Sequence, residues 1–462
     1  MRYDVVIIGA GFAGLTVANH VALAGLRPLV LETGTGEFYP CNSRVSTGAI
    51  HLAFRSPDEP ASELFESILS GTDGSAREDI AWALAANAKS TIDWMRQEGC
   101  EFMQHPRRSW GMPMMMPGRE MRAGLDWENS GPNLFLGTLT EKLRQRGGEL
   151  RLGTRVIELQ MEHGSVSGVI TEDGQELQTT AVVIADGGFQ ADRDLIGQYI
   201  TRAPNKLRQR NTETGRGDGL RMAIRVGADT VSLDKFYGHV LSREAMTEEN
   251  LWPYPQLDIV CAKGIVVTPD GCRFADEGFG GIYLTNEIAA LADPLSATAV
   301  FDRTVWEDAR ETDIVPPNPS LTENGGTLLE AASLNELAQI SGIDPDGLAA
   351  TVSGYNDLVR SGNSSALLPA RTTQMYPAYP IEHSPFFAIP LCAGITVTSG
   401  GLAVDKNAQV LDKNGVPIAG LYAAGSAVGG LEGGPRAGYV GGLMKAFGIG
   451  RIAGRAIAES LA

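Results

Sequence analysis

A glycine-rich stretch at residues 432–443, EGGPRAGYVGGL, carries a single cation, Arg436. Its five glycines allow the backbone to approach a bound molecule closely. An arginine stays charged at any working pH and can hold an anion through two parallel hydrogen bonds. We therefore predict that Arg436 contacts an anionic group of a ligand. The alternative is a solvent-facing arginine that pairs with Glu432.

A second glycine pattern, GxGxxG, is formed by Gly9, Gly11 and Gly14. In this pattern Gly9 makes a tight turn, and Gly11 lets the backbone approach a pyrophosphate at the start of a helix. Glu32 follows about 20 residues later, where an acid can accept hydrogen bonds from an adenosine ribose and disfavours a 2′-phosphate. The pattern predicts a dinucleotide site for NAD or FAD, rather than a strand–helix turn without a ligand.

The elements expected around these residues are strands and helices of an α/β fold. The apolar run Val5 to Ile8 predicts a buried strand, and Pro28 to Leu31 predicts a second one after the helix that the glycines open. Another strand, Gly420 to Ala423, runs into a glycine turn. The stretch 441–462 has small and apolar residues at helical spacing, so a helix is expected to begin where the Arg436 stretch ends.

The composition limits the classes of partner. The chain has 462 residues, enough for two or three domains, and its net charge of −17 disfavours nucleic acid and anionic membranes. No apolar run is long enough to span a bilayer, and no signal peptide precedes the first strand, so we expect a cytoplasmic protein without membrane insertion. The five cysteines form no CxxC pair, which argues against zinc and against a redox dithiol.

Several further segments match one known family. They are CNSRVSTGA at 41–49, VVIADGGF at 182–189, TGRGDGLRMAIRVGAD at 214–229 and PFFAIPLCAGITVTSGGLAVD at 385–405. With both glycine patterns, they make the chain resemble the fumarate reductase/succinate dehydrogenase flavoprotein superfamily, which includes 3-ketosteroid Δ1-dehydrogenases. The resemblance implies a Rossmann-like FAD-binding domain built from residues 1–244 and 376–462. An α+β cap domain for the substrate, residues 245–375, is inserted into it.

The resemblance also implies which residues contact the cofactor. Covalent members of the family carry a histidine where this chain has Ser43, so non-covalent FAD is expected. The predicted cofactor-binding residues are Gly9, Gly11, Phe12, Ala13, Gly14, Glu32, Thr33, Asn42, Ser43, Thr47, Gly48, Ala49, Val156, Gly187, Asp218, Gly425, Ser426, Gly442 and Leu443.

Members of this family oxidise or reduce a carbon–carbon bond next to a carbonyl, with hydride passing between the substrate β-carbon and flavin N5. Arg436 aligns with a family arginine that anchors a substrate carboxylate. His239 aligns with a substrate-binding histidine, although Val240 replaces the proline that follows it in the family. The alternative for His239 is a structural histidine held by hydrogen bonds.

The expected proton carrier differs from that of fumarate reductases. Their proton-delivering arginine corresponds to Gly281, so we predict that Tyr283, two residues later, takes this role. A tyrosine base needs a pKa below its ordinary value of ~10, and the alternative is that Tyr283 only packs a domain interface. Thr396 and Val397 replace two family histidines, which predicts the loss of one carboxylate-binding group and disfavours a dicarboxylate.

These features predict an FAD-dependent dehydrogenase that introduces a C=C bond α,β to a carbonyl or carboxylate of a small, cyclic keto acid or ketone. An external electron acceptor would reoxidise it. One alternative is an ene-reductase that runs in the opposite direction. Another is a flavin electron-transfer subunit, which would lack a substrate cavity walled by Arg436 and His239. A disulfide reductase would need the paired cysteines that the sequence lacks.

Overall fold

Three short apolar stretches form the centre of the first sheet. In the computed structural model, which describes residues 3–104, 112–119, 124, 127–310 and 317–461, they are β1 (Val5–Ile8), β2 (Pro28–Leu31) and β9 (Ala181–Ile184). All residues of these strands are buried. Parallel strands that are covered on both faces need no polar alternation, which explains the continuous apolar sequence. The two strands predicted at 5–8 and 28–31 are confirmed residue for residue.

The first sheet has nine strands in the order β5-β2-β1-β9-β19-β7-β6, with β18 paired to β19 and β8 to β7. The strand β19 runs parallel to β9 and begins at Pro417, three residues before the predicted start at Gly420. A segment from residues 417–423 therefore lies between strands from the first half of the chain. The remaining bounds are β5 (Glu149–Arg151), β6 (Val156–Glu162), β7 (Ser165–Thr171), β8 (Glu176–Gln178), β18 (Gln409–Leu411) and β19 (Pro417–Ala423).

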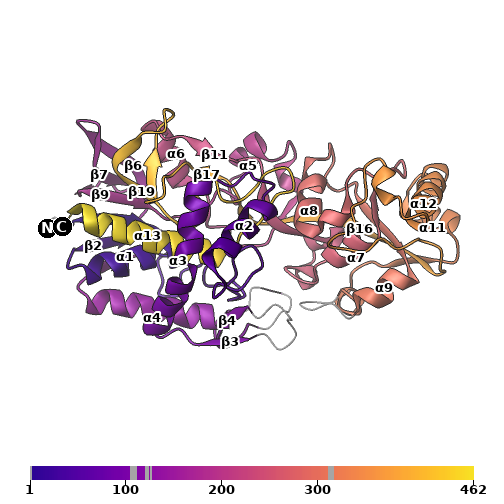
Figure 1. The fold of residues 1–462 in the computed structure, drawn as a ribbon, viewed down its shortest axis with the longest axis horizontal. Coiled ribbons are helices and arrows are strands. Elements are labelled where there is room, and N and C mark those ends of the chain that lie inside the picture. The colour runs from indigo at the N-terminus through magenta and orange to yellow at the C-terminus, as the bar shows by residue number, and fades with distance from the viewer. Residues whose placement is uncertain (1–2, 105–111, 120–123, 125–126, 311–316, 462) are drawn as a thin grey trace.

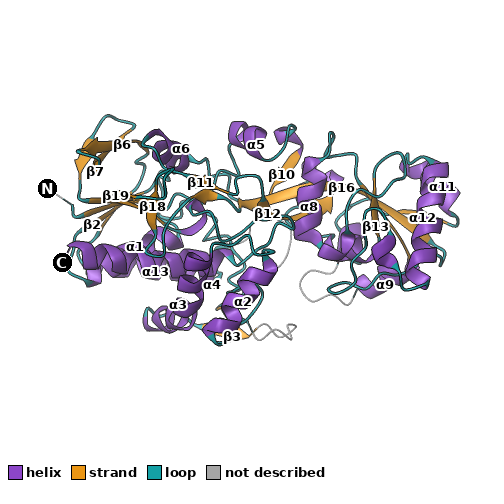
Figure 2. Cartoon of the chain, turned by 45° about the horizontal axis from the view of Figure 1, so that its top comes forward, coloured by secondary structure: helices purple, strands orange, loops and turns teal. Residues whose placement is uncertain are grey.

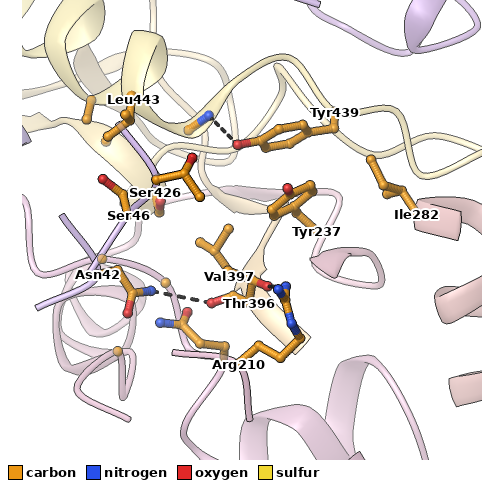
Figure 3. A pocket seen from close by; sticks show the side chains of 18 of the residues that line it. Asn42, Ser46, Arg210, Tyr237, Ile282, Thr396, Val397, Ser426, Tyr439 and Leu443 are labelled. Carbon is orange, nitrogen blue, oxygen red and sulfur yellow. Dashed lines mark hydrogen bonds between the residues drawn. The ribbon is translucent and has the colours of Figure 1, made fainter. Parts of the chain in front are cut away.

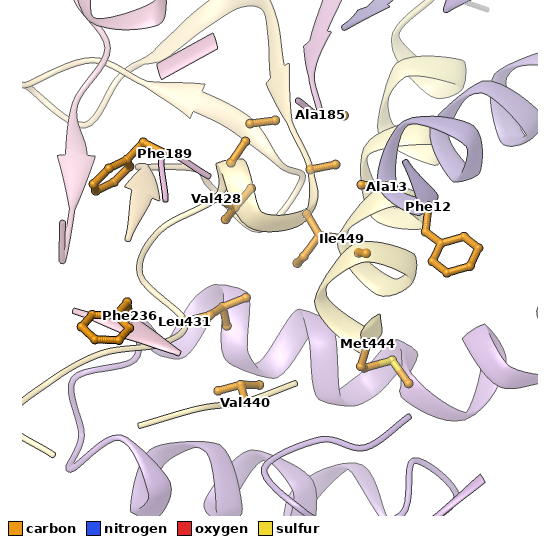
Figure 4. Packing of buried hydrophobic residues seen from close by; sticks show 14 of the residues in the cluster. Phe12, Ala13, Ala185, Phe189, Phe236, Val428, Leu431, Val440, Met444 and Ile449 are labelled. Carbon is orange, nitrogen blue, oxygen red and sulfur yellow. The ribbon is translucent and has the colours of Figure 1, made fainter. Parts of the chain in front are cut away.

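The helices α1 (Phe12–Leu23) and α13 (Gly442–Leu461) lie side by side along this sheet (Figure 1). The centroids of the Phe12 and Phe447 rings lie 4.6 Å apart, and both residues belong to the large apolar cluster. Figure 4 shows Phe12 among other members of this cluster. A Cβ at Gly454 would come within 2.7 Å of the His20 Cβ, so glycine is needed for the two helices to approach. The other helices of this part are α2 (Ala61–Gly71), α3 (Glu78–Gln97), α4 (Gly131–Gln145), α5 (Arg193–Tyr199) and α6 (Asp218–Arg225).

The second sheet has six strands arranged around one long strand, β16 (Phe386–Thr398). The others are β10 (Leu207–Gln209), β12 (Phe236–Ser242), β13 (Ile265–Val267), β14 (Thr298–Asp302) and β15 (Leu329–Ala331). The helices around them are α7 (Asp258–Lys263), α8 (Gly281–Ala290), α9 (Arg303–Ala309), α10 (Ser320–Glu323), α11 (Leu334–Ser341) and α12 (Pro345–Arg360). Two-stranded ribbons join β3 (Phe102–Gln104) to β4 (Pro113–Met115) and β11 (Thr230–Val231) to β17 (Gly401–Leu402).

The molecule is elongated, and the two sheets lie toward its opposite ends (Figures 1 and 2). The start of β1 and the end of α13 lie close together at the end that holds the first sheet. Strands β10, β12 and β16 lie outside residues 245–375, so the second sheet draws strands from both sides of the predicted cap boundaries. The domain division at these residues stays a prediction. Within the described ranges, none of the helices combines the length and apolar character that a bilayer crossing requires.

Candidate active site

A cavity of about 1460 Å³ connects the first sheet to the second. One end, here called the glycine end, is lined by Gly9, Gly11 and Glu32. The opposite part of the wall, here called the tyrosine end, is lined by the side chains Arg210, Tyr237, His239 and Tyr439 (Figure 3 shows three of them).

The glycine end is shaped mainly by the backbone. Gly9 follows β1 with φ +100°, and a Cβ there would lie 2.6 Å from the Ala185 carbonyl oxygen, so only glycine fits this turn. Glu32 is buried, and its carboxylate accepts hydrogen bonds from the N–H groups of Ala10 at 3.0 Å and Gly34 at 2.9 Å. The turn and the acid that follows it are therefore fixed relative to one another.

Three predicted cofactor residues do not line the cavity. Phe12 and Gly14 are buried behind the turn, where a Cβ at Gly14 would lie 2.0 Å from the Gly9 carbonyl oxygen, and Gly48 packs against Pro132. The others line it: Gly9, Gly11, Ala13, Glu32, Thr33, Asn42, Ser43, Thr47, Ala49, Val156, Gly187, Asp218, Gly425, Ser426, Gly442 and Leu443.

Among these lining residues, Asp218 and Ser43 have protein partners that bear on the cofactor prediction. The Asp218 carboxylate accepts two hydrogen bonds from the Arg155 guanidinium, at 2.8 and 2.9 Å. Ser43 Oγ accepts a hydrogen bond from the Phe12 N–H at the start of α1, at 2.9 Å. The hydroxyl that stands in place of the family histidine thus caps the helix.

At the tyrosine end, three side chains form a hydrogen-bonded chain. Asp258 Oδ2 lies 2.6 Å from His239 Nδ1, and His239 Nε2 lies 2.9 Å from the Tyr237 hydroxyl. The second carboxylate oxygen of Asp258 accepts the Val240 N–H at 2.9 Å, which fixes the acid against β12. Tyr237 and His239 are two residues apart on one strand and therefore share a face.

The Tyr439 ring stacks on the Tyr237 ring with centroids 3.8 Å apart. Its hydroxyl accepts a hydrogen bond from the Gly442 N–H at 2.8 Å, at the first residue of α13 (Figure 3). The backbone just after Tyr439 is held by buried Glu432, whose carboxylate accepts the N–H groups of Val440 and Gly441 and pairs with buried Lys445 at 3.1 Å. The position of the Tyr439 hydroxyl is therefore determined by several contacts.

The protonation of these groups is shifted by burial. Desolvation lowers the pKa of His239, the negative charge of Asp258 raises it, and the positive charge of Arg210 lowers it. Burial raises the pKa of Tyr439 well above its ordinary value, and burial with the charge of Glu287 raises the pKa of Tyr283 to about 12. Both tyrosines keep their protons at neutral pH, so neither has the lowered pKa that the sequence-based role of Tyr283 as a base requires.

The three predicted catalytic residues all line the cavity, in different surroundings. The Arg436 guanidinium pairs with Asp73 and lies over the Phe279 ring at 5.0 Å, with its side chain 37% exposed. The alternative prediction that Arg436 pairs with Glu432 is wrong, because Arg436 pairs with Asp73 and Glu432 pairs with Lys445. Tyr283 packs edge-on against Phe279, with ring centroids 5.2 Å apart.

Sequence reasoning missed Arg210, Tyr237, Asp258 and Tyr439. Tyr237 is two residues from His239, a spacing that would have placed both on one face if a strand had been predicted there. Tyr439 lies in the same glycine-rich stretch as Arg436. Arg210 and Asp258 belong to segments with no distinguishing pattern, and only the fold brings them to the cavity.

Comparison with known proteins identifies the class. The FAD binding domain family matches residues 4–439. NADH:fumarate oxidoreductase of Klebsiella pneumoniae is 28% identical over 94% of this chain, which spans only 45% of that protein. The 4-oxocyclohexanecarboxylate 2-dehydrogenase of Sinomonas cyclohexanicum is 26% identical over the whole chain and 93% of its own length. The solved 3-ketosteroid delta1-dehydrogenase of Sterolibacterium denitrificans superposes with a TM-score of 0.75 at 21% identity, covering 99% and 100% of the two chains.

The chain therefore belongs to the FAD binding domain family and to the fumarate reductase/succinate dehydrogenase flavoprotein superfamily. Its cofactor is FAD, and the predicted Rossmann-like α/β fold class is confirmed. The cavity fits this cofactor, because the side-chain-free turn at Gly9 and Gly11 opens onto the start of α1 and Glu32 stands beside it. The described residues contain no cluster of His, Cys, Asp or Glu that could hold a metal ion.

Proposed function

We propose that this protein is an FAD-dependent dehydrogenase that introduces a C=C bond α,β to the carbonyl of a small cyclic keto acid or ketone. The observation that carries the proposal is the arrangement at the tyrosine end. A protonated tyrosine held at a helix start, Tyr439, stacks on Tyr237, which is hydrogen-bonded to the His239–Asp258 pair. One tyrosine can donate to an oxygen while the other can receive a proton.

Tyr439 is assigned to the substrate carbonyl oxygen. Its hydroxyl accepts the Gly442 N–H, so its own proton is left to donate. The partial positive charge at the start of α13 strengthens this donation. Proton loss from the α-carbon places negative charge on the carbonyl oxygen, and a preorganised donor there stabilises the transition state most.

Tyr237 is assigned to the α-carbon proton. Its hydroxyl lies 2.9 Å from His239 Nε2, so His239 can take the tyrosine proton as the tyrosine takes one from carbon. Asp258 accepts the Nδ1–H of His239, which keeps the lone pair of the neutral imidazole on Nε2 and stabilises the imidazolium when it forms. Asp258 is a positioning residue in this scheme.

When bound, FAD would supply the two-electron oxidation that removes hydride from the β-carbon, and an external acceptor would reoxidise it. Ser43 stands where covalent members have a histidine, so we propose that the cofactor is held without a covalent bond. Denaturation should then release all the flavin into the supernatant. Arg436 stays a candidate anchor for a substrate carboxylate, although that role requires it to leave Asp73.

The cyclic keto acid is the substrate class we favour. The match to the 4-oxocyclohexanecarboxylate 2-dehydrogenase extends over the whole of this chain and over 93% of that enzyme. The substrate in its name carries a ketone and one carboxylate. A molecule with one ketone and one carboxylate suits a cavity in which Tyr439 can donate to the ketone oxygen. The cavity has Thr396 and Val397 in place of the two histidines that would bind a second carboxylate.

The test is anaerobic. Oxidised holoenzyme is mixed with 4-oxocyclohexanecarboxylate, cyclohexanone and cyclohexanecarboxylate, and flavin bleaching is followed together with product by mass spectrometry. We expect bleaching with a ketone and loss of two hydrogens from the substrate. No bleaching with any ketone, over a range that includes saturating concentrations, would exclude this reaction class.

The reducing direction is the second candidate, because Tyr283 lines the cavity with a pKa raised to about 12. A phenol that keeps its proton suits protonation of a substrate carbon better than proton removal. Dithionite-reduced enzyme should then be reoxidised by an α,β-unsaturated ketone, and Tyr283→Phe should slow this step more than flavin reduction by a saturated ketone.

A further inference from the structure

Arg210 is placed at the tyrosine end by the second sheet. It follows β10, and its N–H donates to the Ile395 carbonyl at 2.7 Å, so its backbone extends the pairing with β16. The residue is only 8% exposed, yet it lines the cavity. Figure 3 shows its side chain beside Thr396, with Tyr237 between it and Tyr439.

The contacts of the Arg210 guanidinium leave its charge without a counterion. Nη1 donates to the Thr396 hydroxyl at 2.8 Å, and Nε donates to the Pro253 carbonyl at 3.2 Å. The group also lies 5.6 Å from the centre of the Tyr254 ring. Both acceptors are neutral. Within the part of the chain that the structure describes, Nη2 has no acceptor and no carboxylate pairs with Arg210.

Three other buried cations are compensated by a carboxylate or by acceptors for every nitrogen. Arg273 pairs with Glu277, and Lys445 pairs with Glu432. Arg44 pairs with no carboxylate among the described residues. Its three nitrogens donate to the backbone carbonyls of Tyr39 and Glu37 and to the side-chain amide oxygen of Asn133. Arg210 differs from these because a donor remains for a molecule inside the cavity. A buried charge without a partner is costly, so a cavity built this way favours an anionic ligand.

We infer that Arg210 binds the carboxylate of the substrate, an inference that rests on the proposed function above. The planar guanidinium matches a carboxylate in geometry as well as charge, and its Thr396 and Pro253 contacts fix its orientation. A substrate whose carbonyl meets Tyr439 extends past Tyr237 and presents its carboxylate at Arg210. The substrate class is then a keto acid with the two groups at opposite ends, and a neutral ketone is a poor substrate.

The same contact explains the substitution at Thr396. The register between β12 and β16 shifts by one residue between Tyr237 and Gly238, which leaves Thr396 as the extra residue of β16. Bulges of this kind re-aim side chains beside functional sites. The Thr396 hydroxyl accepts from Arg210. An arginine that follows another strand, β10, is thus assigned the place of the carboxylate-binding group that the sequence analysis predicted to be lost.

The first test compares charged and neutral substrates. Wild type, Arg210→Gln and Arg210→Lys holoenzymes are reduced anaerobically by the C4-carboxylated cyclohexanone and by its methyl ester. We expect wild type to prefer the acid by roughly 10- to 100-fold in kcat/KM, the worth of hydrogen bonds to a charged group. Arg210→Gln should bring the acid-to-ester ratio near one, because the variant loses more activity with the acid than with the ester. Arg210→Lys should recover part of the preference, since charge returns without the planar fork.

Two outcomes overturn the inference. One is an unchanged preference for the acid in Arg210→Gln. The other is a loss of that preference in Arg436→Gln but not in Arg210→Gln, which would assign the carboxylate to Arg436. Arg208→Gln is the matched control, because Arg208 is two residues away but pairs with Glu249 and does not line the cavity.

A binding measurement decides the matter even if no ketone is oxidised. Benzoate and benzamide, which have similar shape and differ in charge, are titrated into oxidised holoenzyme by calorimetry. Benzoate should bind wild type and bind Arg210→Gln roughly 10- to 100-fold more weakly, while benzamide should not distinguish the two. Equal benzoate affinity in both proteins overturns the anchor. Absence of flavin bleaching with a normal benzoate difference overturns only the proposed reaction.

Discussion

At the glycine end of the cavity, Gly9, Gly11 and Glu32 come from one continuous strand–helix–strand unit. At the tyrosine end, Arg210, Tyr237 and Tyr439 come from three separate segments. The glycine end works through backbone groups and therefore depends on the absence of side chains. The tyrosine end works through hydroxyl, imidazole and guanidinium groups, whose surroundings set their charge. The two ends should therefore fail in different ways, one through added volume and the other through a lost functional group.

The largest effect is expected from Gly14→Ala at the glycine end. The added Cβ would lie 2.0 Å from the Gly9 carbonyl oxygen and 3.2 Å from Ile7 Cγ2, so the turn cannot keep its shape. We expect protein without bound FAD, measured as the flavin-to-protein ratio after gel filtration. Gly137→Ala in α4, where nothing lies within 4 Å, is the control. A fully loaded Gly14→Ala protein would contradict the view that this end depends on close backbone packing.

The next effect is expected from Tyr439→Phe at the tyrosine end. This change removes only a hydroxyl, so the variant should fold and bind FAD in full. Flavin reduction by the ketone should slow about 10²–10³-fold, the usual cost of removing one preorganised donor. Stopped-flow absorbance under anaerobic conditions measures it. A slowing of less than threefold would mean that the carbonyl oxygen binds elsewhere.

A smaller effect is expected from Asp258→Asn. Without the carboxylate, the orientation and charge of His239 are less well controlled, and the rate should fall roughly 10- to 100-fold, at the lower end for proton-transfer groups. In wild type, burial lowers the pKa of His239 below its ordinary 6.5, so activity that needs neutral His239 is lost as the pH falls through that lowered value. Because Asp258 raises this pKa, the acid limb of the pH profile should move to lower pH in the variant. An acid limb that stays in place would show that His239 is not the titrating group.

The smallest effect concerns Asp186, a half-buried residue at the glycine end with one fully buried carboxyl oxygen. Burial raises its pKa from 3.8 to about 7, and only one of its oxygens has a hydrogen-bond partner, the Gly219 N–H. The protonated form therefore contributes stability that is fully present below pH 3.8 and is lost as the pH rises through about 7. Asp186→Asn should raise Tm at pH 8 by about 1–3 °C relative to wild type and change it less at pH 5. The flavin-to-protein ratio should stay unchanged, in contrast with Gly14→Ala.

The sequence was sufficient where function depends on backbone shape. The strands at 5–8 and 28–31 and the helix after Gly11 follow from apolar runs and glycines that are close in the chain. The family resemblance then gave the cofactor, and most of the predicted contacts line the cavity. These predictions needed only local pattern and one known family.

The tyrosine end could not be predicted in the same way, because its residues are assembled by strand pairing. Arg210 reaches the cavity through the pairing of its backbone with Ile395, and Asp258 reaches His239 from the first residue of α7. The ion pair between Arg436 and Asp73 joins residues 363 positions apart. None of these contacts can be read from the spacing of residues along the sequence. The charge state of each group could therefore be argued only once the structure showed its neighbours.

The position of β19 has a consequence for biosynthesis. This strand, residues 417–423, lies between β7 (165–171) and β9 (181–184) in the sheet. Both of its neighbours therefore come from much earlier in the chain. A ribosome therefore releases more than 200 residues after β9 before the gap in the first sheet can close. Until then the nascent polypeptide exposes unpaired strand edges of strongly apolar sequence, the kind of surface that chaperones protect. The predicted cofactor contact at Gly442 is synthesised later still, so we expect flavin supply during translation to influence yield only late in synthesis.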